Sequence, residues 1–311
     1  MTKPNKQTKL LAHHDVFNEL VNLYLNKNLP NKIILSGYKG IGKSTLAYHL
    51  ANYILSQNEE FNYNLKQREI DKKNKTFNLI ASNTHINFFL ISLSEGKKNI
   101  EILQVRELLN YLTKTSFNNL PKIILIDDCE YLNKNSSNSL LKVLEEPPEN
   151  VYFFLIHNSQ RNILETIKSR CIEFKIFLDQ ESKKKIINNI TQSNYDIFHS
   201  DFKNNYFLPK FYLDYFEYCE MNELDISKTD INLLLENIFI KKNYKRNSFV
   251  NDYLFFLIQN FFYIKFKTTK NKDNYYDLFS YFIKRFDDLI KYNLDFDSFI
   301  IEFKNKVFNE K

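Results

Sequence analysis

The sequence predicts an α/β domain with a parallel sheet covered by helices on both faces, followed by a region made of helices alone. Three observations lead to this fold class. The segment Gly37–Ser44 reads GYKGIGKS, which fits every fixed position of the phosphate-binding pattern G-x-x-x-x-G-K-[ST]. Short apolar runs alternate with helical patterns up to residue 177, and such alternation is typical of parallel sheets. Beyond residue 179 only helical patterns remain.

The glycine loop has a clear chemical purpose. Triphosphate oxygens need several converging backbone N–H donors, and residues without a Cβ atom let the backbone come that close. Gly37, Gly40 and Gly42 are three of only four glycines in the chain, so an ordinary glycine turn is the weaker explanation. Lys43 can reach the outer phosphates, Ser44 can ligate magnesium, and the helix that begins here directs its positive end at the anion. The loop therefore predicts nucleotide binding.

Five apolar runs are expected to form the sheet. They are Lys32–Ser36, Phe88–Leu93, Lys122–Asp128, Val151–Ile156 and Ile172–Phe177. The helices predicted in the same part of the chain are Asp15–Asn26, Lys43–Leu55, Ile102–Leu112, Ser136–Glu146 and Asn162–Lys168. Asp15 is a plausible N-cap for the first of them. The polar stretch Gln57–Thr76 is expected to be an exposed excursion.

The third strand, KIILIDD, ends in two acidic residues. In a domain with a phosphate-binding loop, this strand ends beside the phosphates, and an acid there holds magnesium, partly through water. Asp127 is the residue predicted for that role.

The second half of the chain is predicted to be a helical bundle. Its helices are expected at Gln180–Ile190, Leu208–Cys219, Ile231–Ile240, Ser248–Phe266, Asn274–Lys291 and Phe296–Phe308. One apolar stripe consists of Leu278, Phe282, Phe286 and Leu289 or Ile290, as a core-facing helix requires. The most apolar stretch, Val250–Phe266, contains too many polar residues to span a bilayer and is predicted to be a core helix.

Composition limits the class of protein. At 311 residues the chain can hold two or three small domains. Its net charge of +6 is mild support for a polyanionic partner, although a solvated basic surface is the better explanation. Cys129, Cys171 and Cys219 are too scattered for a zinc site or disulfide framework, which favours a reducing cytoplasm. The N-terminal residues lack the apolar core of a signal peptide.

Three stretches together resemble the clamp-loader subunits of bacterial DNA polymerase III, delta-prime and the related gamma/tau. They are the glycine-loop segment, the run IILIDDCEYLNKNSSNSLLKVLEEPPENVYFFLI, and ETIKSRC ending at Cys171. The resemblance covers roughly residues 10–177 and is strongest in NSLLKVLEEPPE followed by SRC. It implies an AAA+ nucleotide-binding domain at 1–177, a small helical lid at 178–222 and an all-α C-terminal domain at 223–311 that joins a collar.

The resemblance also implies roles for single residues. The nucleotide cradle would be Gly37, Gly40, Ile41, Gly42, Lys43, Ser44 and Thr45, with ATP as ligand and Mg²⁺ held by Ser44 and Asp127. Asn158, with His157 beside it, matches the sensor that polarises the attacking water. Arg170 matches the arginine that reaches into a neighbouring subunit's ATP site, where a guanidinium stabilises charge on the γ-phosphoryl group. A local ion pair is the alternative for Arg170.

Two departures from the family pattern bear on catalysis. Active subunits carry Asp-Glu where this chain has Asp127-Asp128, and the shorter Asp128 is a weakened base. They also have a lid arginine, whereas no arginine occurs here between Arg170 and Arg246. Many relatives contain a four-cysteine zinc module after the first long helix, but 57–84 has no cysteine, so no zinc is expected.

The sequence thus favours a clamp-loader subunit that binds ATP, hydrolyses it weakly or not at all, and contributes Arg170 to a neighbour. Its implied partners are the gamma/tau and delta subunits in a hetero-oligomer, the sliding clamp, and primed DNA through the complex, with no membrane. A gamma-like ATPase motor and a non-enzymatic scaffold with a relic loop are the alternatives.

Overall fold

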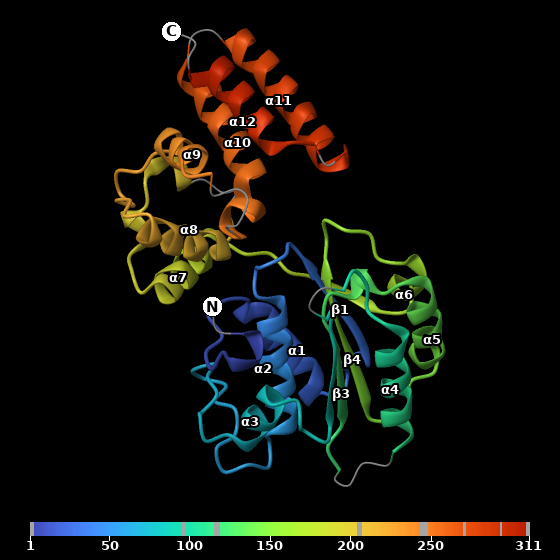
Figure 1. Ribbon diagram of the computed structural model, residues 1–311. Helices are drawn as coiled ribbons and strands as arrows, with labels where there is room; N and C mark the ends of the chain where they lie inside the picture. The colour runs from blue at the N-terminus through green and yellow to red at the C-terminus, as the bar shows by residue number, and fades with distance from the viewer. Residues whose placement is uncertain are drawn as a thin grey trace. The chain divides into compact units, whose positions relative to one another are not determined.

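A computed structural model gives the structure of residues 3–94, 97–114, 119–203, 207–242, 248–269, 272–292 and 294–308. Their contacts divide the chain into two compact units, 1–186 and 187–311. The first unit contains the sheet and the second is helical (Figure 1).

The first unit is organised on one five-stranded sheet in which every pairing is parallel. Its strands are β1 (Lys32–Gly37), β2 (Phe88–Ile91), β3 (Lys122–Ile126), β4 (Val151–Asn158) and β5 (Ile172–Lys175). They lie in the order β2-β3-β4-β1-β5, so β1 is paired with β4 on one side and β5 on the other. The runs Ile123–Ile126 and Phe153–Ile156 are buried throughout, as expected of strands covered on both faces.

Helices cover both faces of this sheet (Figure 1). One side carries α1 (His14–Leu25), α2 (Lys43–Leu55) and α3 (Lys75–Ala81), with η1 (Pro4–Lys6) beside them. The other carries α4 (Ile102–Thr113), α5 (Lys134–Glu145) and α6 (Glu165–Lys168), and the short η2 (Cys129–Tyr131) follows β3. The predicted fold class is confirmed.

Two lysines, the partly buried Lys32 and the buried Lys122, join the sheet to the helices on the second side. Lys32, at the start of β1, donates from Nζ to the carbonyl of Leu144 at 2.8 Å, near the end of α5. Lys122, at the start of β3, donates to the carbonyl of Tyr111 at 3.1 Å, near the end of α4. A cation at a helix C-terminus satisfies free carbonyls and complements the helix dipole. These lysines therefore have structural roles.

One local prediction is wrong, and another holds only in part. Asp15 is not the N-cap of α1, because the helix begins at His14, and His13 lies before it in the left-handed region with φ of 61°. The stretch Gln57–Thr76 is not simply an exposed excursion. Tyr63 and Asn74 within it are buried, and Asn74 accepts a 2.9 Å hydrogen bond from Asn52 of α2. Side-chain hydrogen bonds thus hold this segment against α2, and periodicity cannot reveal such bonds.

His49 of α2 is part of the same buried contact. Its Nδ1 atom lies 2.9 Å from the hydroxyl of Tyr63, and the ring is fully buried. Burial lowers the pKa of His49 to about 4, and the backbone of Gln7 opposes this shift with a smaller effect. The folded state therefore keeps His49 neutral under conditions in which the unfolded chain takes up a proton.

We expect this difference to make stability depend on pH. The pKa of His49 is lowered on folding, so its contribution is complete above pH 6.5 and is lost as pH falls from 6.5 towards 4. The loss is at most about 3 kcal/mol. Urea unfolding of the wild type and of His49→Asn, at a series of pH values, measures it. Equal pH dependence in both proteins would contradict this prediction.

The second unit contains the remaining helices. α7 (Gln180–Thr191) begins in the first unit and ends in the second. It is followed by η3 (Tyr195–Ile197), η4 (Ser200–Phe202), α8 (Pro209–Met221), α9 (Ile231–Ile240), α10 (Ser248–Thr268), α11 (Lys272–Tyr292), α12 (Phe296–Phe303) and η6 (Lys304–Phe308). Within the residues described, no helix is long and apolar enough to cross a membrane.

One aromatic-rich core holds the second unit together. It includes residues from the predicted lid, such as Tyr212 and Tyr215, and from the predicted C-terminal domain, such as Phe261 and Phe282. The predicted stripe on α11 is buried at Phe282, Phe286 and Leu289 and packs against this core at Leu278, while the Ile290 side chain lies outside the described residues. The division at residue 222 stays a prediction.

Candidate nucleotide-binding site

The glycine loop connects β1 to α2, and its geometry requires glycine. At Gly37 a Cβ atom would lie 2.4 Å from the carbonyl oxygen of Ile176, so no side chain fits. Gly42 directly precedes α2 with φ of 97°, a conformation that L-residues rarely adopt. Ile41 of the loop is buried, and Thr45 lies half-buried in the first turn of α2.

Lys43, the first residue of α2, is buried with only 5% of its surface exposed. Its Nζ atom donates to the carbonyl oxygens of Gly37 at 2.9 Å and Tyr38 at 2.6 Å. Burial lowers the pKa of Lys43, and neighbouring carboxylates oppose that shift. The ammonium group is thus fixed at the loop by two of its three donors.

Ser44 and Asp127 face each other across the site. The Ser44 hydroxyl lies 3.0 Å from both carboxylate oxygens of Asp127, which directly follows β3. Burial, and secondly the charge of Asp128, raise the pKa of Asp127 to about 6. Hydroxyl and carboxylate oxygens are the ligands that Mg²⁺ prefers, and a nucleotide-associated Mg²⁺ needs only one or two protein ligands. These two residues therefore fit the predicted metal role.

Asp128 has an unusual backbone conformation. Its φ is 56°, and its N–H donates to Oδ1 of Asp127 at 3.0 Å. Asp tolerates the left-handed region better than most residues. The turn thus places the second acid next to the first.

Asn158 ends β4 directly beside Gly37 in the parallel register. The adjacent Ser159 donates its N–H to the Gly37 carbonyl at 3.1 Å, which joins the end of β4 to the glycine loop. Oδ1 of Asn158 accepts from the N–H of Gln160 at 3.2 Å. His157 contacts the Ser36 hydroxyl and the Arg161 carbonyl through its two ring nitrogens, so its role here is structural.

The sequence reasoning missed Glu130. This residue lies in η2, and its Oε2 accepts the Asn158 N–H at 3.1 Å. Of the carboxylates that oppose the lowered pKa of Lys43, Glu130 acts most strongly, followed by Asp127 and Asp128. The only signal in the sequence is an acid two residues after Asp128, and the turn that brings it to the site has no periodic pattern.

Arg170 lies just after α6 and is engaged within its own unit. Its Nε and Nη2 atoms donate to the same oxygen of Glu145, at 3.0 and 2.6 Å, and Nη1 donates to the Thr166 carbonyl at 2.8 Å. The local ion pair considered as the alternative is therefore present in this chain. The role of Arg170 in a neighbour's site stays a prediction.

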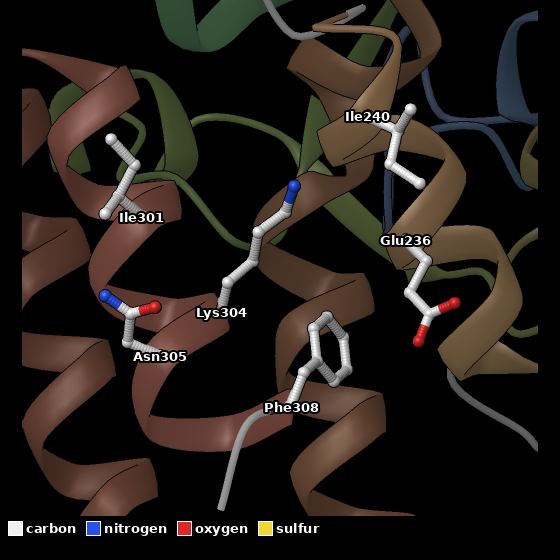
Figure 2. Close-up of a pocket in the computed structure, with 6 residues that line it drawn as sticks. All are labelled: Glu236, Ile240, Ile301, Lys304, Asn305 and Phe308. Carbon is white, nitrogen blue, oxygen red and sulfur yellow. The ribbon is translucent and has the colours of Figure 1, made fainter.

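A separate cavity of about 340 Å³ lies within the helical unit. It is lined by Glu236 and Ile240 of α9, Ile301 of α12, and Lys304, Asn305 and Phe308 of η6. Figure 2 shows the Lys304 side chain between Ile301 on one side and Ile240 and Glu236 on the other. None of the residues predicted to bind nucleotide lines it. Among the described residues no cluster of His, Cys, Asp and Glu is suited to holding a metal ion by itself.

The sheet order, the glycine loop and the Ser44–Asp127 pair define an α/β domain of the P-loop AAA+ class. The family described as "DNA polymerase III, delta subunit" matches residues 12–179, more than half of the chain. The chain belongs to this family of clamp-loader subunits, and the resemblance stated from the sequence is confirmed.

Individual relatives agree with the family. The chain is 34% identical over 140 residues to the DNA polymerase III subunit delta' of Pseudomonas aeruginosa, covering 45% of this chain and 41% of the relative. It is 34% identical over 150 residues to the subunit gamma of Buchnera aphidicola, covering 48% and 39%. The chain thus spans less than half the length of these two relatives.

A solved structure with a similar arrangement is a DNA polymerase III gamma subunit-related protein from Thermotoga maritima. Its TM-score is 0.44 at 17% identity, over 91% of this chain and 96% of that one.

Proposed function

We propose that this protein is a delta-prime-like clamp-loader subunit that binds ATP with Mg²⁺, hydrolyses it weakly or not at all, and supplies Arg170 to a neighbouring ATPase subunit. The observation that carries the nucleotide part is the buried Lys43, held at a glycine loop beside the Ser44–Asp127 pair. Family membership carries the clamp-loader part.

Each residue of the site has a role in this proposal. The backbone N–H groups of the loop and the start of α2 bind the phosphates, because glycine leaves room for them. Lys43 directs its remaining N–H at an outer phosphate oxygen. Ser44 and Asp127 hold Mg²⁺, which neutralises phosphate charge when bound. Asn158 sits at the end of β4, where it orients water near the γ-phosphate.

Weak hydrolysis follows from Asp128. Its carboxylate is one methylene shorter than the glutamate of active relatives and therefore holds an attacking water less well. A further acid, Glu130, has the largest effect of the nearby carboxylates on Lys43, and its charge also opposes that of a γ-phosphate. The shorter side chain of Asp128 is therefore the feature that favours binding over turnover.

The proposed assembly contains gamma/tau and delta subunits and acts on the sliding clamp and primed DNA. In that assembly the helical C-terminal residues would join the collar. A cytoplasmic location is part of the proposal, because Cys129, Cys171 and Cys219 are all free thiols.

The gamma-like motor is the second candidate, favoured by the 34% identity to a gamma subunit. Asp128 and the absence of arginine between Arg170 and Arg246 weigh against it. The relic-loop scaffold is disfavoured because Lys43, Ser44 and Asp127 keep a coherent geometry.

The test measures binding and hydrolysis on the same preparation of the isolated protein. We expect saturable, Mg²⁺-dependent ATP binding and negligible phosphate release. Rapid turnover by the protein alone would replace this proposal with the motor, and failure to bind either ATP or ADP would leave only the scaffold.

A further inference from the structure

The contact between Arg170 and Glu145 joins the two sequence motifs that identify the family. Glu145 is the last residue of α5, in LLKVLEEPP, and Arg170 is the arginine of SRC. The two side chains are 51% and 32% exposed, so the ion pair lies at the surface of the first unit. It is accessible to a partner without unfolding of either helix.

The arginine has almost no hydrogen-bonding capacity left for a phosphate. Of its five N–H groups, Nε and one on Nη2 are taken by Glu145, and Nη1 donates to the Thr166 carbonyl and, at 3.3 Å, to the Ser169 hydroxyl. One N–H remains. A bidentate contact with a phosphoryl group needs two parallel donors. The Glu145 carboxylate therefore occupies an edge of the guanidinium that a phosphate would use.

Glu145 is also badly placed for its own helix. A carboxylate at a helix C-terminus meets the negative end of the dipole, which is unfavourable. A positive charge already lies at the carbonyl end of α5, because Nζ of Lys32 donates a hydrogen bond to the Leu144 carbonyl at 2.8 Å. The stability of α5 therefore gives no reason for an acid at this position, whereas the contact with Arg170 does.

We propose that Glu145 is a resting partner for Arg170, a carboxylate that stands in for a phosphate until a neighbouring subunit presents its triphosphate. The exchange is one anion for another on the same guanidinium edge, with no bond made or broken. Glu145 thus acts as a brake on the finger, in the free subunit and in the complex, as long as the neighbour's triphosphate does not contact Arg170. This inference rests on the proposed finger role of Arg170.

The size of the brake is limited by exposure. Partly exposed ion pairs contribute up to about 1 kcal/mol, which corresponds to a factor of about five. Salt screens such a pair, so the effect of the brake is expected to shrink as ionic strength rises. A merely structural role for Glu145 would not produce this pattern.

The experiment uses the reconstituted complex with clamp and primed DNA, and measures kcat/KM for ATP. We expect Glu145→Gln to raise it two- to fivefold at low salt, with a smaller gain at high salt. Glu146→Gln is the matched control, because it removes the same charge from the next residue and, in the described structure, no hydrogen bond joins Glu146 to Arg170. Glu145→Ala should behave like Glu145→Gln.

Comparison with Arg170→Ala separates this inference from the function on which it rests. If Arg170→Ala lowers the rate but Glu145→Gln leaves it unchanged or lowers it, Arg170 is a finger and Glu145 is not its brake. If Arg170→Ala itself has no effect on the rate, the finger role fails and the brake fails with it. A melting curve of each variant subunit confirms that the subunits compared are folded.

Discussion

Arg170→Ala is expected to lower ATP hydrolysis by the assembled complex on the order of 10³-fold, because an arginine finger in trans stabilises charge on the transferred phosphoryl group. The isolated subunit should keep its fold and its own nucleotide binding. Its lost ion pair with Glu145 is partly exposed and contributes at most about 1 kcal/mol. Arg170→Lys should restore little activity, since a point charge cannot reproduce the planar fork.

Two measurements decide the role of Arg170. They are a melting curve of the variant subunit and the clamp- and DNA-stimulated ATPase of the reconstituted complex. Lys168→Ala is a suitable control, because it removes a positive charge only two residues from Arg170. The Nζ atom of Lys168 lies 3.8 Å from Oε2 of Glu173. A normal complex ATPase with a lowered melting temperature would show that Arg170 serves only its local ion pair.

Lys43→Ala is expected to weaken ATP binding to the isolated protein on the order of 10²-fold, because charge-assisted hydrogen bonds to phosphate are among the strongest in proteins. The fold should persist. The Gly37 carbonyl keeps its hydrogen bond from Ser159 at 3.1 Å, and removing a buried ammonium relieves its cost of burial. Titration with a fluorescent ATP analogue measures the change.

Assembly should be affected less than binding by this substitution. The collar contacts are assigned to the helices after Asn222, whereas Lys43 lies in the first unit. Lys39→Ala is the matched control, since Lys39 is an exposed lysine of the same loop. If Lys43→Ala prevents complex formation while Lys39→Ala does not, the nucleotide has a structural role and this division between the two units is wrong.

Local pattern was enough to predict the parallel sheet and its helices. Phosphate chemistry allows few solutions for a glycine loop, and buried strands carry continuous apolar runs, so both features are visible without tertiary information. α2 and α9 have the predicted boundaries, and the ends of α1, α4, α5 and α6 lie within three residues of the predicted ones. The short α3 was missed because seven residues in a polar stretch have little periodicity.

The sequence by itself determined that Gly37, Lys43, Ser44 and Asp127 belong to one site, because the ends of parallel strands meet at one edge of a sheet. Only the tertiary structure decided which groups surround them. Glu130 reaches the site through a turn that has no periodicity, and Glu145 meets Arg170 from 25 residues away in the chain. Within the segment 57–76, Asn74 is buried by hydrogen bonds of its side chain, and composition alone assigns such a residue to the surface. Contacts between side chains distant in sequence form only when the fold brings the two segments together. Local sequence patterns therefore do not reveal them.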